Sequence, residues 1–314
     1  MEYVTTLSTN ESIAITIGNF DGVHRGHQRL MHQLCATAQE LNCMPVLTTF
    51  SPHTLIVLRP DIDVQCLTTL EEKLALAKRY GHIADSIVIT FTPQVAAMSA
   101  EEFMDSLHAL FDIRAIVVGS DFSLGHNRMG DIPFLQNYGQ QHEILVRSIP
   151  LEEIERTRIS STRIRTLVSE GQIAEANELL GHPVTLRGIV VHGEHRGRLL
   201  GFPTANLMPE PHKLLPANGV YAVHVQNISA SDSISSSPVY NGVANIGVRP
   251  TFNEKKRIVE AYLLDVDLDL YDQCISIDFV ARLRDEQRFA GIDALKAQIS
   301  VDVQQAYQIL VAAS

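Results

Sequence analysis

The sequence contains no tryptophan and only four cysteines among its 314 residues. Cys35, Cys43, Cys66 and Cys274 form no CxxC pair and no regular framework, which argues against a structural zinc site or a set of disulfides. We therefore expect reduced thiols and a cytoplasmic location.

Positive charge is also scarce, and long apolar runs are absent. Lys and Arg number 25 against 36 Asp and Glu, and the net charge of −11 argues against nucleic acid or an acidic membrane surface as a partner. Nowhere do about 18 uncharged apolar residues run together. The N-terminal segment "MEYVTTLSTNES" lacks the basic and apolar regions of a signal peptide. The sequence therefore predicts neither export nor a membrane span.

What the sequence does have is the length and composition of two globular domains. A chain of 314 residues exceeds the usual domain of about 100–200 residues, and its 45% hydrophobic residues can bury two cores. In the first part, β-branched runs alternate with helical patterns, which predicts an α/β domain with a parallel sheet. The predicted strands are "SIAITIG", "PVLTTF", "DSIVIT", "RAIVVGS" and "HEILVRSI".

From about residue 184, strand patterns follow one another without helices between them, which predicts an antiparallel sheet or a small barrel. A last amphipathic helix is expected to cover an open part of that barrel. One side of this helix carries Leu295, Ile299, Val303, Ala306 and Leu310. A helical pattern ends in Gly181, followed by His182 and Pro183, so we place the domain boundary there, between 1–181 and 182–314.

Residues 17–30, "IGNFDGVHRGHQRL", join a predicted strand to a predicted helix. A helix N-terminus offers unpaired N–H groups and a partial positive charge, so phosphates bind there readily. His24 and His27 are three residues apart, on one side of the first helical turn, where imidazoles can donate to phosphate oxygens. Three glycines would let the backbone approach a ligand closely: Gly18, Gly22 and Gly26.

Each of these histidines, taken alone, would more often be a helix cap or a surface residue. The combined H-x-G-H pattern is instead typical of nucleotidyltransferases that react at the α-phosphate of ATP. No lysine follows a glycine anywhere in the chain, so a Walker-type phosphate loop is absent.

Two further segments have the composition of ligand loops. In "ISSTRIRTLVSEG", Ser160, Ser161 and Thr162 precede a helix with Arg163 and Arg165, and hydroxyls and guanidinium groups both bind phosphate. Taken alone, that segment is better explained by an ordinary helix cap with solvent-facing arginines. The segment "VVGSDFSLGHNRMGD" follows a strand and combines three glycines with an aspartate and a phenylalanine, although a plain surface turn has similar glycines.

Nine motifs in chain order match one known family: "TIGNFDGVHRGH", "TFSPHT", "GSDFSLG", "ISSTRIR", "GFPTANL", "GVYAV", "GVANIGVRPTF", "VEAYLLDVDLDLY" and "LRDEQRF". With them the chain resembles, over essentially its whole length, the prokaryotic bifunctional riboflavin kinase/FAD synthetase family. The resemblance implies a Rossmann-like nucleotidyltransferase domain, and a small antiparallel β-barrel with a terminal α-helix. It implies that ATP phosphorylates riboflavin to FMN in the second domain. In the first domain, ATP would adenylylate FMN to FAD and release pyrophosphate.

The resemblance also implies roles for residues of the first domain. His24, His27 and Arg165 are expected to be catalytic, because they would stabilise charge on the reacting phosphates. Asp121 and Phe122 are expected to bind the flavin. The residues expected to bind ATP there are Gly18, Phe20, Asp21, Gly22, His24, Gly26, His27, Ser160, Ser161, Thr162 and Arg165.

In the second domain, Gly193, Gly197 and Gly201 belong to a loop that could close on ATP phosphates through backbone N–H groups. Thr204 and Asn206 offer the hard oxygen ligands that Mg²⁺ prefers. Taken alone, "GFPTAN" has the composition of a simple turn, so the metal site depends on the resemblance.

Glu260 follows Val259 in a predicted strand, where alternation points the two side chains to opposite faces and leaves Glu260 in solvent. The resemblance implies instead that Glu260 is the general base that deprotonates the ribityl hydroxyl. Arg249 is expected to bind the flavin.

The sequence departs from the family pattern at Thr54, at Asn241 and at Asp272, where proline, proline and glycine are common. Asp272 lies at a predicted turn, where aspartate tolerates left-handed backbone, but its presence in place of glycine argues against a tight turn there. Two other functions stay open: a flavin- or nucleotide-binding module with a decayed catalytic site, and an enzyme that forms aminoacyl adenylates. The latter class pairs H-x-G-H with a lysine-rich KMSKS loop, whereas "ISSTRIR" stands in the equivalent place here.

Overall fold

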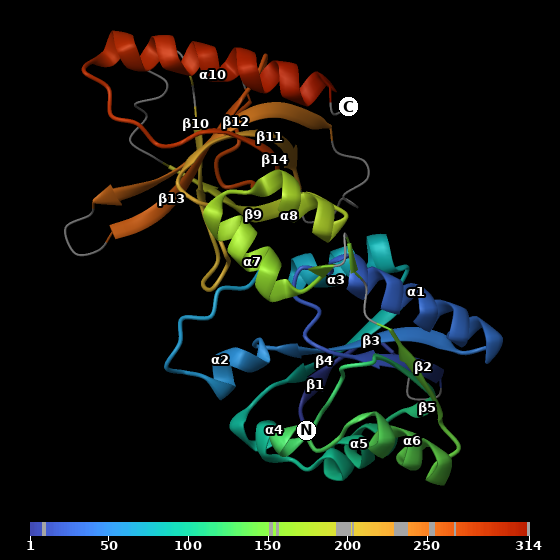
Figure 1. Cartoon of the computed structure of the whole chain (residues 1–314). Coiled ribbons are helices and arrows are strands. Elements are labelled where there is room, and N and C mark those ends of the chain that lie inside the picture. Colours follow the sequence, from blue (N-terminus) through green and yellow to red (C-terminus); the bar gives the residue numbers. More distant parts are fainter. Residues whose placement is uncertain are drawn as a thin grey trace. The chain divides into compact units, whose positions relative to one another are not determined.

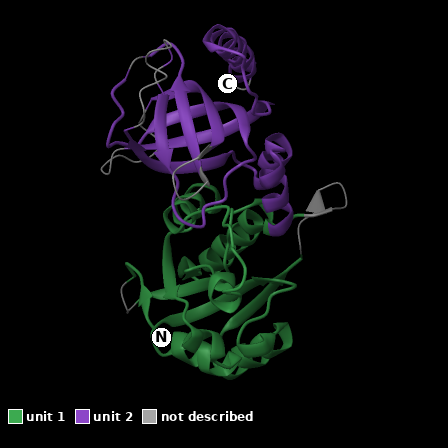
Figure 2. Cartoon of the chain, turned by 90° about the vertical axis from the view of Figure 1, so that its left-hand side faces the viewer, with its two compact units in different colours: residues 1–161 green, residues 162–314 purple. Residues whose placement is uncertain are grey.

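The computed structural model describes residues 1–7, 11–150, 153–154, 157–192, 202, 204–228, 238–250, 255–266 and 268–312. The chain divides into two compact units, residues 1–161 and 162–314, coloured separately in Figure 2. Among the described residues, no helix combines the length and the apolar composition that a membrane crossing requires.

The first unit is built on one six-stranded sheet with the order β1-β4-β3-β2-β5-β6. Its strands are β1 Tyr3–Val4, β2 Ser12–Ile17, β3 Met44–Ser51, β4 Asp85–Thr90, β5 Asp112–Gly119 and β6 Leu145–Ile149. All neighbouring pairs are parallel except β1 and β4. The predicted parallel sheet is therefore confirmed, and the carboxyl ends of β2, β3 and β5 lie side by side at one edge, where α/β sheets bind ligands.

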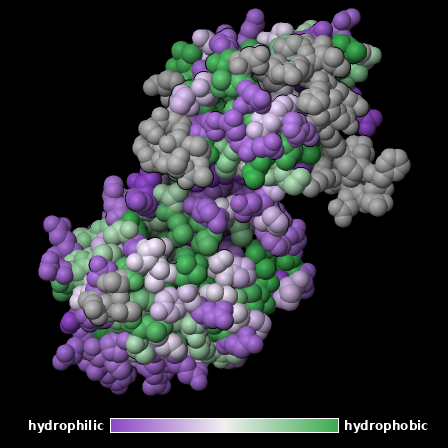
Figure 3. All heavy atoms as spheres, turned by 180° about the vertical axis from the view of Figure 1, so that it is seen from behind, coloured by the Kyte–Doolittle hydropathy of each residue, from purple (hydrophilic) through white to green (hydrophobic). Residues whose placement is uncertain are grey.

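Helices cover both faces of this sheet (Figure 1). They are α1 Arg25–Glu40, α2 Thr54–Leu58, α3 Leu70–Gly81, α4 Pro93–Ala97, α5 Ala100–His108, the 3₁₀ turn η1 His126–Arg128 and α6 Ile132–Gln141. Strand alternation supplies two cores, because Ala14 and Leu47 pack toward α1 and α3, while Ile15 and Val46 pack toward α5 and α6. In Figure 3, hydrophilic residues gather over the end of this unit that α5 and α6 form, as expected for amphipathic helices.

The second unit is a closed barrel of antiparallel strands in the order β10-β13-β12-β11-β14-β9, with its interwoven strands visible in Figure 2. The strands are β9 Val184–Val191, β10 Thr204–Met208, β11 Gly219–Asn227, β12 Val239–Pro250, β13 Lys255–Leu263 and β14 Cys274–Arg284. The predicted barrel is confirmed. Asp272 has a φ of 60° within a turn, so it adopts the left-handed backbone that aspartate tolerates.

The terminal helix α10, Ile292–Ala312, packs against the outside of this barrel. Our expectation that it covers an opening was wrong, because all six strands are joined into a closed ring. Ala306 and Leu310 are fully buried against Val220 and Val243 of the outer barrel face. The helix buries apolar barrel surface that alternation turned outward.

Two helices precede the barrel strands in the chain: α7 Ser161–Glu170 and α8 Ile173–Leu180. The short strands β7 Glu153–Ile154 and β8 Thr157–Arg158 come before them. The Nδ2 of Asn177 in α8 donates to the carbonyl of Phe279 at 2.8 Å, and its Oδ1 accepts from the N–H of Val184 at 2.7 Å. The helix ends at Gly181 in left-handed backbone with φ 75°, as the sequence predicts. These contacts place α8 on the barrel, within the second compact unit.

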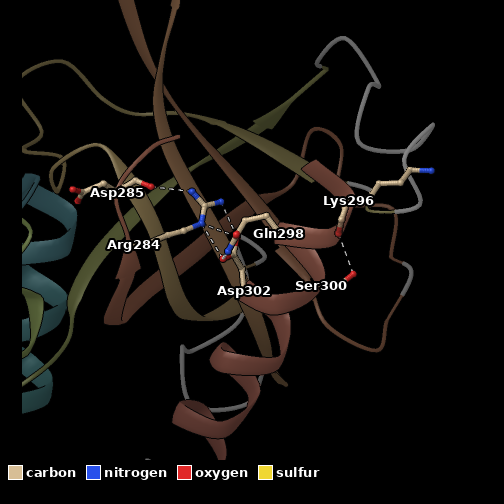
Figure 4. Close-up of polar contacts among 6 residues, drawn as sticks. All are labelled: Arg284, Asp285, Lys296, Gln298, Ser300 and Asp302. Atoms are coloured by element: carbon tan, nitrogen blue, oxygen red, sulfur yellow. Dashed lines mark hydrogen bonds and ion pairs between the residues drawn. The ribbon is translucent and has the colours of Figure 1, made fainter. Parts of the chain in front are cut away.

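One ion pair fastens α10 to β14 (Figure 4). Asp302 is only 2% exposed, although it lies on an otherwise apolar helix face. The Arg284 guanidinium donates from Nε at 2.9 Å to Oδ1 and from Nη2 at 2.7 Å to Oδ2 of Asp302. Gln298 Nε2 donates to the same carboxylate at 2.9 Å, so both charged groups are well satisfied.

We expect Asp302→Asn to lower the free energy of unfolding of the barrel unit by about 3–5 kcal/mol, because it leaves the Arg284 charge uncompensated against the barrel. Urea unfolding of the full chain, followed by circular dichroism, would show the barrel transition at lower urea. Asp293→Asn, at an exposed position in the first turn of α10, is the matched control and should leave that midpoint nearly unchanged. Equal midpoints for the two variants would contradict the role given to the pair.

Candidate functional site

The turn between β2 and α1 holds the histidine pair. His24 is the N-cap of α1, and its Nδ1 accepts a hydrogen bond from the backbone N–H of His27 at 3.3 Å. Because Nδ1 accepts, the proton of a neutral His24 ring lies on Nε2, which makes that atom a donor. The two rings stack with centroids 3.6 Å apart. The prediction that both histidines lie on one side of the first helical turn is confirmed.

His27 lies in an apolar and electropositive setting. Its ring packs edge-on against Phe20, with the centroids 5.2 Å apart. Burial, and then electrostatic interaction with His24 and with Lys73, lowers the pKa of His27 well below its usual value, so the ring is neutral at pH 7. Its Nδ1 is buried and has no hydrogen-bond partner among the described residues. An orphaned polar atom at a helix start fits a site that receives the oxygens of a ligand.

The backbone of this turn is strained. Phe20, Gly22 and Val23 all have positive φ, at 48°, 81° and 40°. For a β-branched residue such as Val23 this conformation costs of order 1–3 kcal/mol, and such strain gathers at functional sites. The turn persists because Val23 is fully buried and its N–H donates to the Phe20 carbonyl at 3.1 Å.

Asp21 ties this turn to other parts of the same unit. Its buried carboxylate accepts from the backbone N–H groups of Leu67 at 3.1 Å and Thr68 at 3.0 Å, in the loop before α3. The Ser161 hydroxyl donates to the Asp21 carbonyl at 2.8 Å. The start of the "ISSTRIR" segment therefore reaches the histidine turn, and Asp21 acts in the structure as a brace for that turn.

The neighbouring strand β5 leads to Asp121 and Phe122. Both follow the carboxyl end of β5, beside β2, so they lie at the same edge of the sheet as the histidine turn. The Phe122 N–H donates to the Gly119 carbonyl at 3.0 Å, which closes a tight turn. Gly125 has φ 73°, and a Cβ there would lie 2.5 Å from the Ala100 backbone N, so this loop position requires glycine.

Sequence reasoning missed several residues that support the turn. Asn19 Nδ2 donates to the Thr54 hydroxyl at 2.8 Å, and its Oδ1 accepts from the Thr54 N–H at 3.3 Å. A proline at position 54 would have neither donor nor hydroxyl, so this departure from the family pattern adds contacts at the site. Lys73 was missed as well, because an isolated lysine in a helical pattern looks like a solvent-facing residue.

The second candidate site lies on the outer face of the barrel. Asn206, Glu260 and Asn245 stand directly opposite one another on β10, β13 and β12, so their side chains share one face. Val259 and Ala261, the neighbours of Glu260, are fully buried in the barrel. Glu260 lies on the opposite face, as alternation predicts, but it is half-buried and not fully exposed to solvent. Asn245 was not identified from the sequence, since only strand pairing brings it to this row.

The next row on the same face contains Thr204, Tyr262 and Val243. Tyr262 and Val243 pack in the apolar cluster under α10. The Phe202 ring meets Tyr262 edge-on, with the centroids 5.3 Å apart. Thr204 and Asn206 are therefore two residues apart on a strand face that α10 stabilises from one side.

Glu286, from the "LRDEQRF" motif, also lies beside the row. A Cβ at Gly247 would be 2.5 Å from its Oε1 and 3.6 Å from Asn245 Nδ2. Glu286 Oε2 accepts from Asn218 Nδ2 at 3.3 Å. The missing side chain at Gly247 thus lets a second carboxylate approach the polar row.

Some of the predicted site residues are not placed at either candidate site by the structure. Gly193, Gly197 and Gly201 lie outside the described residues. Arg249 lies in β12, and Thr162 and Arg165 lie in α7 within the second unit. Their predicted functions stay predictions, as do those of Ser160 and Gly26.

Comparison with known proteins covers both candidate sites. The family model for FAD synthetase matches residues 6–163, and the model for riboflavin kinase matches residues 180–310. The bifunctional riboflavin kinase/FMN adenylyltransferase of Escherichia coli (strain K12) is 38% identical, over 93% of this chain and 91% of that protein. The chain belongs to the bifunctional riboflavin kinase/FMN adenylyltransferase family.

Other relatives support this membership. The bifunctional riboflavin kinase/FMN adenylyltransferase of Pseudomonas fluorescens is 37% identical over 92% of this chain and 90% of that protein. A solved structure from Streptococcus pneumoniae, described as a macrolide-efflux protein, has 30% identity and a TM-score of 0.85, with 96% of both chains covered. As a bifunctional riboflavin kinase/FMN adenylyltransferase, the enzyme carries both domains in one chain.

Proposed function

We propose that FMN adenylylation takes place at the histidine turn of the first unit. A phosphate oxygen of FMN attacks the α-phosphorus of ATP, the bond to the β-phosphate oxygen breaks, and pyrophosphate leaves. His24 and His27 donate to phosphate oxygens as negative charge develops, while Gly18, Gly22 and Gly26 allow close backbone approach. The observation that carries this assignment is the stacked histidine pair at a helix N-terminus, with the buried Nδ1 of His27 lacking a described partner.

Riboflavin phosphorylation is proposed for the polar row of the barrel. Glu260 accepts the proton of the ribityl hydroxyl, whose oxygen then attacks the γ-phosphorus of ATP, and ADP leaves. The cross-strand register supports this role, because it sets the Glu260 carboxylate between the amides of Asn206 and Asn245. The two amides can hold the carboxylate or the substrate hydroxyl in position.

The donor set on β10 fits Mg²⁺. Thr204 and Asn206 present a hydroxyl and an amide oxygen on one strand face, and Mg²⁺ prefers hard oxygen ligands and completes its shell with phosphates and water. Among the described residues, no group of three or more His, Cys, Asp and Glu could hold a metal ion. When bound, Mg²⁺ neutralises charge on the phosphoryl oxygens. Thr204 and Asn206 would hold it beside the base Glu260.

The remaining assignments complete the proposal. Asp121, Phe122 and Arg249 are assigned to flavin binding, and Ser160 and Ser161 are assigned to the ATP phosphates of the first site. Gly193, Gly197 and Gly201, which lie outside the described residues, are assigned to the ATP phosphates of the kinase site. The four cysteines are free, which supports the cytoplasm as the location of the enzyme.

A time course with riboflavin, ATP and Mg²⁺ tests this scheme. We expect FMN and ADP to form first, then FAD and pyrophosphate, and we expect chelation of Mg²⁺ to stop FMN formation.

Asn206→Leu should abolish kinase turnover and keep FAD formation from added FMN. A fragment starting at residue 162, and one starting at 182, should both make FMN but no FAD if the boundary separates the activities. Flavin binding with no product from either substrate would instead identify a decayed binding module.

A further inference from the structure

Lys73 is a buried cation that none of the assigned roles uses. It is the fourth residue of α3, and its side chain is 4% exposed, although lysine is almost never fully buried without a partner. The first turn of α3 is fixed by a capping box, in which the Thr69 hydroxyl accepts from the Glu72 N–H and the Glu72 carboxylate accepts from the Thr69 N–H. The backbone therefore holds Lys73 in one place.

The Lys73 side chain reaches the strand ends that carry the histidine turn. Its Nζ donates to the Thr49 hydroxyl at 3.2 Å, and that hydroxyl donates to the Asn19 carbonyl at 3.3 Å. Thr49 lies near the carboxyl end of β3, and Asn19 follows β2. The ammonium thus lies under the edge of the sheet at which β2 and β3 present the turn.

The loop before α3 connects the same two regions a second time. Asp21, in the histidine turn, accepts from the N–H groups of Leu67 and Thr68, directly before the Thr69 cap. The Thr68 hydroxyl accepts from the Gly22 N–H at 3.1 Å. Movement of α3 would therefore move Asp21 and Gly22, so Lys73 and the turn form one rigid assembly.

The charges around Lys73 explain why it stays buried. Burial lowers the pKa of the Lys73 ammonium, while electrostatic interaction with Asp21, and then with Cys66, raises it. Burial, and then interaction with His24 and with Lys73, lowers the pKa of His27. His24 acts on His27 from the turn and Lys73 acts on it from α3, whereas Arg25 and Arg29 of α1 are exposed.

We propose that Lys73 is a positioning residue for adenylyl transfer, which supplies a buried positive charge beneath the histidine pair and fixes the turn that holds it. The proposal rests on the proposed function of that turn. In the free enzyme the charge favours neutral, N–H-donating His27. With ATP bound, the same charge stabilises the polyphosphate without the cost of ordering a mobile side chain. A merely structural lysine would fix α3 and leave the electrostatics of His27 unchanged.

The test compares full-length Lys73→Met with Lys73→Arg and with Lys78→Met, an exposed lysine of the same helix that serves as control. Methionine keeps much of the length and apolar packing but removes the charge. We expect Lys73→Met to lower kcat/KM for FAD formation from FMN between about tenfold and 10²-fold. FMN formation from riboflavin should stay within twofold. Lys73→Arg should recover part of the lost activity, and Lys78→Met should behave as wild type.

The decisive readout is the titration of His27, followed by NMR with labelled histidine and assigned from the signal that His27→Ala loses. Loss of the Lys73 charge removes a repulsion on protonated His27, so its titration moves to higher pH in Lys73→Met and stays in place in Lys78→Met. An unshifted titration overturns the proposal, whether activity falls or not, and so does FAD formation within twofold of wild type.

If Lys73→Met does not fold, Thr49→Val removes the Nζ acceptor and keeps the charge. Because the charge is kept, we then expect a several-fold loss of FAD formation with a His27 titration close to that of wild type, and FAD formation within twofold of wild type overturns the proposal. Normal FAD formation by His27→Ala would refute the proposed turn itself, independently of any result on Lys73.

Discussion

His27→Ala is expected to lower FAD formation from FMN by about 10²–10³-fold, the usual effect of losing one donor to developing negative charge. FMN formation from riboflavin should stay near wild type, because the barrel has its own core and its own polar row. Both rates come from one assay in which FMN, FAD, ADP and pyrophosphate are separated. His32→Ala is the matched control, since His32 lies on the exposed side of the same helix and stacks on His82.

His27 should also affect how the stability of the enzyme depends on pH. The pKa of His27 is lower in the folded enzyme than in the unfolded chain, where it is about 6.5. The unfolded state therefore binds more protons, and the stability that His27 contributes is present above pH ~6.5 and is lost as the pH falls below it. Wild type should lose more stability than His27→Ala between pH 7 and pH 5. Equal loss of both enzymatic activities in His27→Ala would point to unfolding and contradict the assignment.

The second large effect is expected for Glu260→Gln. The amide keeps the size and the packing of the side chain, but it does not accept a proton from a hydroxyl near neutral pH. We expect FMN formation to fall by about 10²–10⁴-fold, which is the usual contribution of a general base. FAD formation from added FMN should be normal, and the melting temperature should hardly change, since the residue lies on the outer face of the barrel.

Glu178→Gln, at an exposed position of α8, controls for the loss of one carboxylate from the same unit. Kinase turnover within twofold of wild type in Glu260→Gln would show that Glu260 is an ordinary strand residue and not the general base. If Glu286→Gln also lowers the rate of FMN formation, then the second carboxylate beside Asn245 takes part in the reaction as well.

Local sequence was sufficient wherever a residue's role depends on near neighbours. The alternation of strands and helices predicted a parallel sheet, and Gly181 predicted the end of α8. The pair His24 and His27 could be placed together because three residues make almost one helical turn. The motifs in chain order were enough to indicate the family.

Contacts between distant segments were decided by tertiary structure alone. No local pattern shows that Asn245 faces Glu260, that Asp302 meets Arg284, or that a closed ring of strands leaves α10 on the outside. Lys73 shows the reason most clearly. Its helical spacing is that of a solvent-facing lysine, and only the packing of α3 beneath the ends of β2 and β3 buries its charge, because burial depends on what the fold brings against a side chain.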